Sequence, residues 1–153
     1  MKNLILENDE ATNILGQKIS EIILSSNKKD IEIHLQGELG AGKTFLTRSI
    51  IKNSGWEDLV KSPTYTLCEE YDLDEILYLH IDLYRTNEAQ DIDIFDLNRS
   101  SHKKKIILIE WPEMLQSERN FDLKIYFSHH ENKRKINIDY GTEVFKALER
   151  NYV

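Results

Sequence analysis

The chain has 153 residues, of which 40% are hydrophobic and 31% are charged, a composition typical of one soluble globular domain rather than a disordered chain. Its 20 Lys and Arg residues against 27 Asp and Glu residues give a net charge of −7, which makes the chain as a whole a poor binder of polyanions. The single cysteine, Cys68, excludes an internal disulfide, and no segment approaches the ~20 apolar residues of a membrane helix. Acidic residues near the N-terminus also argue against a signal peptide. We therefore expect one cytoplasmic domain over residues 1–153, without membrane association.

Apolar spacing predicts that the first part of the chain alternates between helix and strand. Residues 9–26 place apolar side chains at helical spacing, with Asp9 and Glu10 at the positive end of the helix dipole. Residues 31–36 (IEIHLQ) alternate apolar and polar side chains, which predicts a strand with one polar side. Residues 43–54 return to helical spacing, and the glycine that follows is a suitable stop.

The middle of the chain predicts strands on either side of an acidic helix. Residues 66–72 and 76–84 are typical of two strands joined by a short turn, and residues 87–99 of a helix. Residues 105–110 (KIILIE) form a continuous apolar run, which indicates a strand that is covered on both faces.

The last part of the chain predicts an antiparallel hairpin and a closing helix. Residues 122–127 and 135–140 flank HHENKR, where His129 and His130 are expected to be exposed. Residues 142–153 are expected to form a short helix with Thr142 as a candidate cap. The whole order predicts an α/β fold with a mixed central sheet flanked by helices and a C-terminal antiparallel hairpin.

The stretch GELGAGKT, between the predicted strand and the second predicted helix, fits the phosphate-loop pattern G-x-x-x-x-G-K-[ST]. Glycines let backbone N–H groups converge on phosphate oxygens, and the following helix adds the positive end of its dipole. Lys43 would charge-pair with the β and γ phosphates, and Thr44 would offer a hydroxyl to Mg²⁺. The nucleotide-binding residues predicted here are Gly37, Glu38, Leu39, Gly40, Ala41, Gly42, Lys43 and Thr44. Because NKRK at 132–135 lacks the acid of a guanine-reading Asn-Lys-x-Asp motif, we favour ATP over GTP.

Two acids follow apolar runs and are candidates to hold Mg²⁺ or to position water. Glu110 ends KIILIE and Asp82 lies in HIDLYR, so both are expected at the carboxyl edge of the sheet, where ligands bind. The alternative for each is an ordinary acid that caps a turn. Trp111 follows Glu110 and would lie either near the nucleotide or in the core.

Other polar residues near these motifs leave two interpretations open. Ser62 and Thr64 in KSPTYT lie where a nucleotide-sensing segment would follow the phosphate-loop helix. His80 would be a base or, more commonly, a strand histidine bonded to the backbone. Arg134 would reach a phosphate or a base edge, although a surface role is equally compatible with the sequence.

Taken together, GELGAGKT, KSPTYTLCEEY, HIDLYR and LIEWPE resemble, in order and spacing, the TsaE family of bacterial P-loop ATPases of tRNA threonylcarbamoyladenosine synthesis. The resemblance runs from near Asn8 to near Tyr140. It implies that Lys43 contacts the phosphates, that Thr44 and Glu110 serve Mg²⁺, and that Asp82 has a functional role.

The resemblance has less specific implications for the remaining site residues. It places Ser62, Thr64 and Tyr65 near the γ-phosphate or a partner surface, and it aligns Arg134 with a basic residue that contacts the nucleotide. A residue near Glu10 or Thr12 would border the adenine.

The resemblance also implies partners and a role. Family members act with the TsaB and TsaD proteins, where TsaD transfers the threonylcarbamoyl group to an adenosine beside the anticodon and TsaB is a scaffold. The TsaE-like protein would bind that pair and hydrolyse ATP to ADP and phosphate, which resets the complex between turnovers. Direct contact with tRNA stays open.

Three functions are compatible with the sequence. A partner-stimulated ATPase would use Lys43, Asp82 and Glu110 to stabilise and orient in-line attack by water. A small-molecule kinase would use Asp82 as a base and Arg85 on a phosphate, but the chain has little length for an acceptor pocket. A nucleotide-gated interaction module would bind ATP with little hydrolysis. The fate of the γ-phosphate separates the first two.

Overall fold

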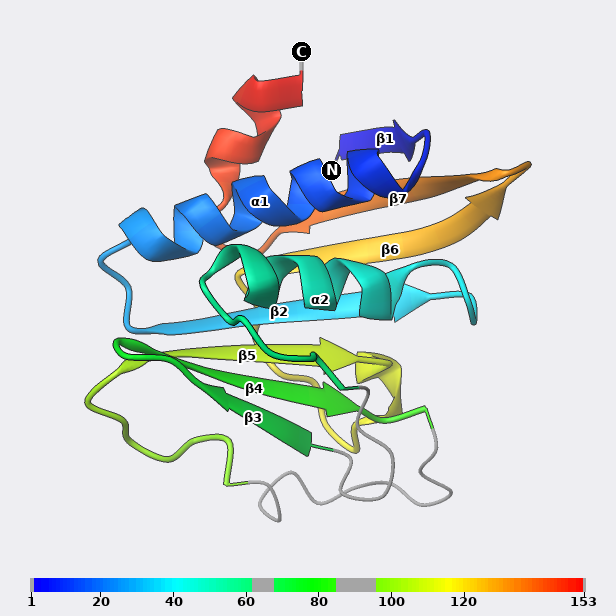
Figure 1. Ribbon diagram of the computed structural model, residues 1–153. Coiled ribbons are helices and arrows are strands. Elements are labelled where there is room, and N and C mark those ends of the chain that lie inside the picture. Colours follow the sequence, from blue (N-terminus) through cyan, green and yellow to red (C-terminus); the bar gives the residue numbers. More distant parts are fainter. Residues whose placement is uncertain (1, 62–67, 85–95, 153) are drawn as a thin grey trace.

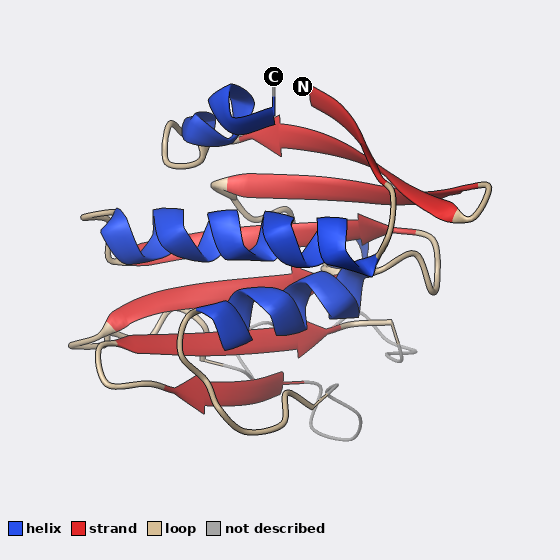
Figure 2. Ribbon diagram, turned by 45° about the horizontal axis from the view of Figure 1, so that its top comes forward, coloured by secondary structure: helices blue, strands red, loops and turns tan. Residues whose placement is uncertain are grey.

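A seven-stranded mixed sheet carries both α-helices on one face in the computed structural model (Figures 1 and 2). The structure describes residues 2–61, 68–84 and 96–152. The strands are β1 (Lys2–Leu6), β2 (Asp30–Gly37), β3 (Cys68–Asp72), β4 (Ile76–Asp82), β5 (Lys104–Glu110), β6 (Leu123–His130) and β7 (Lys133–Tyr140). The helices are α1 (Asp9–Ser25) and α2 (Lys43–Asn53), and two short 3₁₀ segments are η2 (Pro112–Met114) and η3 (Lys146–Tyr152). The prediction of an α/β fold with a mixed sheet is confirmed.

The centre of the sheet is parallel and its margins are antiparallel. The strand order is β1-β7-β6-β2-β5-β4-β3, and the pairs β6–β2, β2–β5 and β5–β4 are parallel. The carboxyl ends of β2, β4 and β5 therefore meet at one edge of the sheet. The predicted C-terminal hairpin is confirmed as β6 and β7, which run further than expected and leave a tight turn in which Glu131 has a φ of 56°.

Both faces of β5 are covered, as its continuous apolar run predicts. Ile106 and Leu108 belong to the main core beneath α1 and α2. Ile107 and Ile109 belong to a second cluster on the other face, with Leu97 among its buried members. Helices on one face and loop residues on the other therefore keep this strand dry.

Both helices begin at the predicted residues, Asp9 for α1 and Lys43 for α2. Asn8 caps α1 because its Oδ1 accepts the N–H of Ala11 at 2.9 Å, and Asp9 and Glu10 fill the first turn. Beyond the end of α2, Gly55 takes a φ of 114°, which suits a helix stop. No helix in the described part of the chain is long and apolar enough to cross a membrane.

Three elements differ from the sequence prediction. The strand β1 was not predicted. The helix expected over residues 87–99 is wrong at its C-terminal end, because residues 96–98 form a turn. Residues 87–95 lie outside the described residues. The closing segment is the 3₁₀ segment η3 rather than an α-helix. It is anchored by the buried side chains of Phe145, in the turn just before it, and Leu148 within it. Thr142 precedes it and donates its hydroxyl to Asp122.

Candidate functional site

The loop between β2 and α2 lies at the carboxyl edge of the parallel strands. Its glycines Gly37, Gly40 and Gly42 all have positive φ, at 137°, 74° and 114°. The helix α2 starts at Lys43, and among the described residues no side chain caps its first N–H groups. These backbone donors and the helix dipole therefore face an open edge, which is the arrangement that binds anions.

Arg134 of β7 packs directly against this loop. A Cβ on Gly42 would lie 2.7 Å from Arg134 Nε, so a side chain at this position would displace the guanidinium. The guanidinium donates to Thr12 Oγ1 at 2.8 Å, pairs with Asp9 Oδ1 at 3.0 Å and lies 5.0 Å from the centre of the Phe45 ring. The structure thus places Arg134 beside the phosphate loop, at the N-terminal end of α1.

The Lys43 side chain is buried inside the loop, with only 4% of the residue exposed. Its ammonium donates to the carbonyl oxygens of Gly37 and Glu38, each at 2.7 Å, and lies 4.4 Å from the centre of the Trp111 ring. Burial lowers the pKa of Lys43, and nearby carboxylates, Glu110 first, oppose that shift. The cation is therefore fixed at the point where the loop would receive a phosphate.

A chain of three side chains links the loop to the core. Glu110 is buried at 2% exposure; its Oε1 accepts the Thr44 hydroxyl at 2.9 Å and its Oε2 lies 2.5 Å from Nε2 of His80. The expectation that His80 bonds to the backbone is therefore wrong, because its partner is a carboxylate. Asp82 is the residue paired with Glu110 across β4 and β5, and its Oδ1 accepts the N–H of Tyr84 at 3.0 Å.

The donor set at this edge suits Mg²⁺. The Thr44 hydroxyl and the Glu110 carboxylate are in contact, and Asp82 lines the same hollow. All three present oxygen, the ligand that Mg²⁺ prefers, next to a loop fit for phosphates. The residues present therefore fit a Mg²⁺–nucleotide complex.

Trp111 lies over the Lys43 ammonium and also packs against the second hydrophobic cluster. Its backbone is left-handed, with φ 61° and ψ 51°, a strained conformation for a bulky residue and one that often marks functional sites. Its backbone N–H donates to the carbonyl oxygen of Leu35 at 3.1 Å, and the centre of its ring lies 4.8 Å from that of Tyr84. The indole thus borders Lys43 while its other contacts join the second hydrophobic cluster.

A hollow of about 450 Å³ unites most of the predicted site residues. It is lined by Leu39, Gly40, Gly42, Lys43, Thr44, Phe45, Asp82, Tyr84, Glu110, Trp111 and Arg134. Ala41 is instead buried towards the core, and Glu38 points its carboxylate to the N–H of exposed His129 at 3.2 Å. Ser62, Thr64, Tyr65 and Arg85 lie outside the described residues. Sequence reasoning missed Phe45 and Tyr84, although both adjoin motif residues that it had selected.

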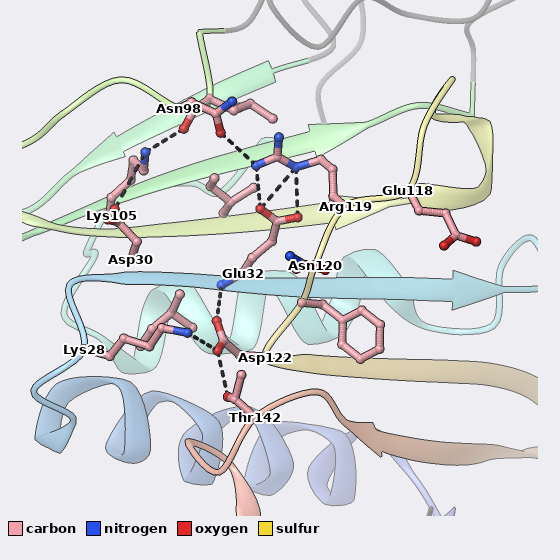
Figure 3. Close-up of a pocket in the computed structure, with 14 residues that line it drawn as sticks. Lys28, Asp30, Glu32, Asn98, Lys105, Glu118, Arg119, Asn120, Asp122 and Thr142 are labelled. Carbon is pink, nitrogen blue, oxygen red and sulfur yellow. Dashed lines mark hydrogen bonds and ion pairs between the residues drawn. The ribbon is translucent and has the colours of Figure 1, made fainter.

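A second hollow, of about 510 Å³, lies near the amino ends of β2, β5 and β6 (Figure 3). There Glu32 accepts from both Nε and Nη2 of Arg119, at 3.0 and 2.7 Å, and lies 2.6 Å from His34. Burial would raise the pKa of Glu32, but the hydrogen bonds from His34 and Arg119 outweigh it and hold that pKa below its usual range. Asp122 likewise accepts from Glu32 N and from the Thr142 hydroxyl. These charges satisfy one another, so the network ties strands together.

The polar side of β2 is therefore buried rather than open to solvent. Glu32 and His34 are only 9% and 2% exposed. The alternation in IEIHLQ predicted the polar side correctly, but not what covers it.

Comparisons with known proteins agree with this architecture and its motifs. The family "Threonylcarbamoyl adenosine biosynthesis protein TsaE" matches residues 6–136. A "tRNA threonylcarbamoyladenosine biosynthesis protein TsaE" of Haemophilus influenzae is 35% identical over 135 residues, covering 87% of this chain and 85% of that protein. The protein of the same name from Aquifex aeolicus is 34% identical over 140 residues, covering 90% and 96%.

A solved structure gives the same result for the fold. The crystal structure of Bacillus subtilis YdiB matches with a TM-score of 0.69 and 23% identity, covering 98% of this chain and 92% of that one. The family match spans most of the described sheet, together with the phosphate loop and the strand that ends in Glu110. The chain accordingly belongs to the TsaE family of tRNA threonylcarbamoyladenosine biosynthesis.

Proposed function

We propose that this chain hydrolyses ATP with Mg²⁺, and that it does so as a partner-stimulated ATPase of tRNA N⁶-threonylcarbamoyladenosine synthesis. One observation carries the proposal: Lys43, Thr44 and Glu110 converge at the carboxyl edge of the parallel strands, beside a glycine loop with open helix N–H groups. That convergence suits a nucleotide triphosphate whose phosphates lie in the loop.

The chain's own residues account for in-line hydrolysis. The loop N–H groups and the Lys43 ammonium would stabilise the charge that develops on the γ-phosphate oxygens. Asp82 and Glu110 would orient a water whose oxygen bonds to the γ-phosphorus as the bond to the β–γ bridging oxygen breaks. ADP keeps that bridging oxygen, and inorganic phosphate leaves with the water oxygen.

Thr44 and Glu110 would hold the Mg²⁺, which when bound neutralises phosphate charge. Trp111 closes one side of the loop above Lys43, and Arg134 closes another side near Thr12. Arg134 thus lies where it would contact the nucleotide beyond the phosphates.

Family membership and charge support a proposal for the partners. We propose that the chain acts on the TsaB–TsaD pair and resets it between turnovers. A protein with a net charge of −7 is poorly suited to hold tRNA by itself, and work on protein partners removes that need.

Phosphate release from Mg²⁺–ATP tests the proposal. We would measure it for the pure protein alone and with the matching TsaB–TsaD pair, and compare the wild type with Lys43→Ala. Lys52→Ala is the matched control, because Lys52 is an exposed lysine of α2. We expect stimulated release in the wild type and in Lys52→Ala, and none in Lys43→Ala.

The other outcomes point to the competing functions. No release in either mixture, with ATP still bound, would indicate a nucleotide-gated interaction module. Transfer of the γ-phosphate to an acceptor other than water would indicate a kinase. Asp82→Ala and Glu110→Ala separate the two acids by their turnover and Mg²⁺ dependence, and normal turnover in both would refute the proposed site.

A further inference from the structure

His80 is a fully buried polar residue that no motif role explains. It lies on β4 with 0% exposure, on the sheet face that α2 covers, one position before Ile81 of the opposite face. Its register partner on β5 is Leu108, so the Glu110 side chain, two residues further on, projects from the same face. The strand pairing therefore brings an imidazole and a carboxylate together beneath the phosphate loop.

The contact between them has a defined direction. A carboxylate oxygen only accepts hydrogen bonds, so Nε2 of His80 donates to Oε2 of Glu110 across 2.5 Å. The other ring nitrogen, Nδ1, is buried and has no hydrogen-bond partner among the described residues. In a neutral imidazole one ring nitrogen is a donor and the other an acceptor, so a donating Nε2 corresponds to the Nε2–H tautomer.

The consequence for Glu110 is that its two oxygens have different tasks. Oε2 is held in the core by His80, while Oε1 is turned towards Thr44 at 2.9 Å. Without the His80 donor, Oε2 would be a buried carboxylate oxygen lacking its partner, and the side chain would gain by rotating away from Thr44.

We propose that His80 is a positioning residue that orients Glu110 for the Mg²⁺ site of the phosphate loop, an inference that rests on the proposed function. Partners that orient a metal-binding carboxylate typically change metal affinity by about 10- to 100-fold when they are removed. The effect of His80 should therefore be seen in metal-dependent nucleotide affinity, without any turnover.

The test measures the affinity for ADP by calorimetry, with and without Mg²⁺, in four proteins. In the wild type, the ratio of the two dissociation constants gives the factor by which Mg²⁺ strengthens ADP binding. His80→Leu removes the donor, while His80→Gln keeps a side-chain N–H that can reach the Nε2 position. Tyr78→Phe is the matched control, because Tyr78 is a buried residue of the same strand and face whose hydroxyl bonds to Ser54 at 2.6 Å, away from Glu110.

We expect the factor by which Mg²⁺ strengthens ADP binding to be about 10- to 100-fold smaller in His80→Leu than in the wild type. The affinity for ADP without Mg²⁺ should be unchanged. His80→Gln should recover most of the loss, and Tyr78→Phe should behave as the wild type. If Mg²⁺ strengthens ADP binding equally in His80→Leu and the wild type, the positioning role alone is overturned. The same holds if Tyr78→Phe loses as much of this effect as His80→Leu. If Mg²⁺ does not strengthen ADP binding by the wild type, both the Mg²⁺ site of the proposed function and the positioning role are overturned.

A measurement that keeps His80 in place covers the case in which His80→Leu does not fold. Nitrogen-15 spectra of the imidazole rings should show His80 as the Nε2–H tautomer, with a proton resonance that moves in Glu110→Gln. An Nδ1–H tautomer, or a resonance indifferent to Glu110→Gln, would overturn the proposal.

Discussion

Removal of Arg119 should destabilise the fold by breaking a buried ion pair on the polar side of β2. Its guanidinium makes hydrogen bonds of 2.7 and 3.0 Å to the Glu32 carboxylate, and the two side chains are 16% and 11% exposed. Loss of one partner from a buried pair costs about 3–5 kcal/mol. His34 would still donate to Glu32, and the pair is partly open to water, so we expect Arg119→Ala to lose about 2–3 kcal/mol at pH 7.

The same substitution should have a distinct pH dependence. The folded-state pKa of Glu32 lies below its usual value of 4.5, so its ionisation stabilises the fold above that pH and the benefit is lost as the pH falls. In Arg119→Ala, burial would raise this pKa, and Glu32 would take up a proton more readily in the folded state. The difference in stability between wild type and variant should therefore shrink below about pH 4.5.

Urea unfolding followed by tryptophan fluorescence at pH 7 and pH 4 measures both effects. Arg99→Ala is the matched control, because Arg99 pairs with Glu70 at the surface, where the two side chains are 29% and 53% exposed. It should lose less than about 1 kcal/mol. A loss below about 1 kcal/mol for Arg119→Ala at pH 7 would contradict a stabilising role of the Arg119–Glu32 pair, and so would an equal loss at both pH values.

Three further substitutions or reactions test other contacts. A Cβ on Gly16 would lie 2.1 Å from Ser49 Oγ where α1 crosses α2, so Gly16→Ala should lose about 1–3 kcal/mol in urea unfolding and regain part of it when combined with Ser49→Gly. Gly42→Ala forces a positive φ on a residue with a side chain and displaces Arg134, so calorimetry should show at least about tenfold weaker ATP binding, and unchanged affinity would contradict our account of the loop. Burial raises the pKa of Cys68 to about 11, so iodoacetamide should label it at least about tenfold more slowly than free cysteine at pH 8, with a rate that rises steeply above pH 9.

The parts of the molecule that sequence reasoning predicted are those whose determinants are local. GELGAGKT carries its own glycines, lysine and hydroxyl within one loop. The structure places the Lys43 ammonium inside this loop and the Thr44 hydroxyl against Glu110. The continuous apolar run of β5 likewise identified a strand covered on both faces. Each of these features depends on neighbours only a few residues away.

What the sequence could not supply depends on long-range pairing. The five residues of β1 form a strand because Leu4 pairs with Ile136 and Leu6 with Arg134, near the far end of the chain. The bond between His80 and Glu110 exists only because β4 and β5 pair in one particular register. Arg119 showed no motif, and its partner Glu32 is recognisable only once the strands are packed.

The strand order also has a consequence for the protein during its synthesis. The strand β2, which leads into the phosphate loop, has β5 and β6 as neighbours, and both are translated after it. At ~5–20 residues per second, the apolar side chains of β2 would wait on the order of several seconds for their partners. Pairing of this non-local kind is slow, and it leaves strand edges open to misassociation. The complete phosphate-loop sequence would thus be synthesised well before the strands that pair with β2 and hold the loop in place.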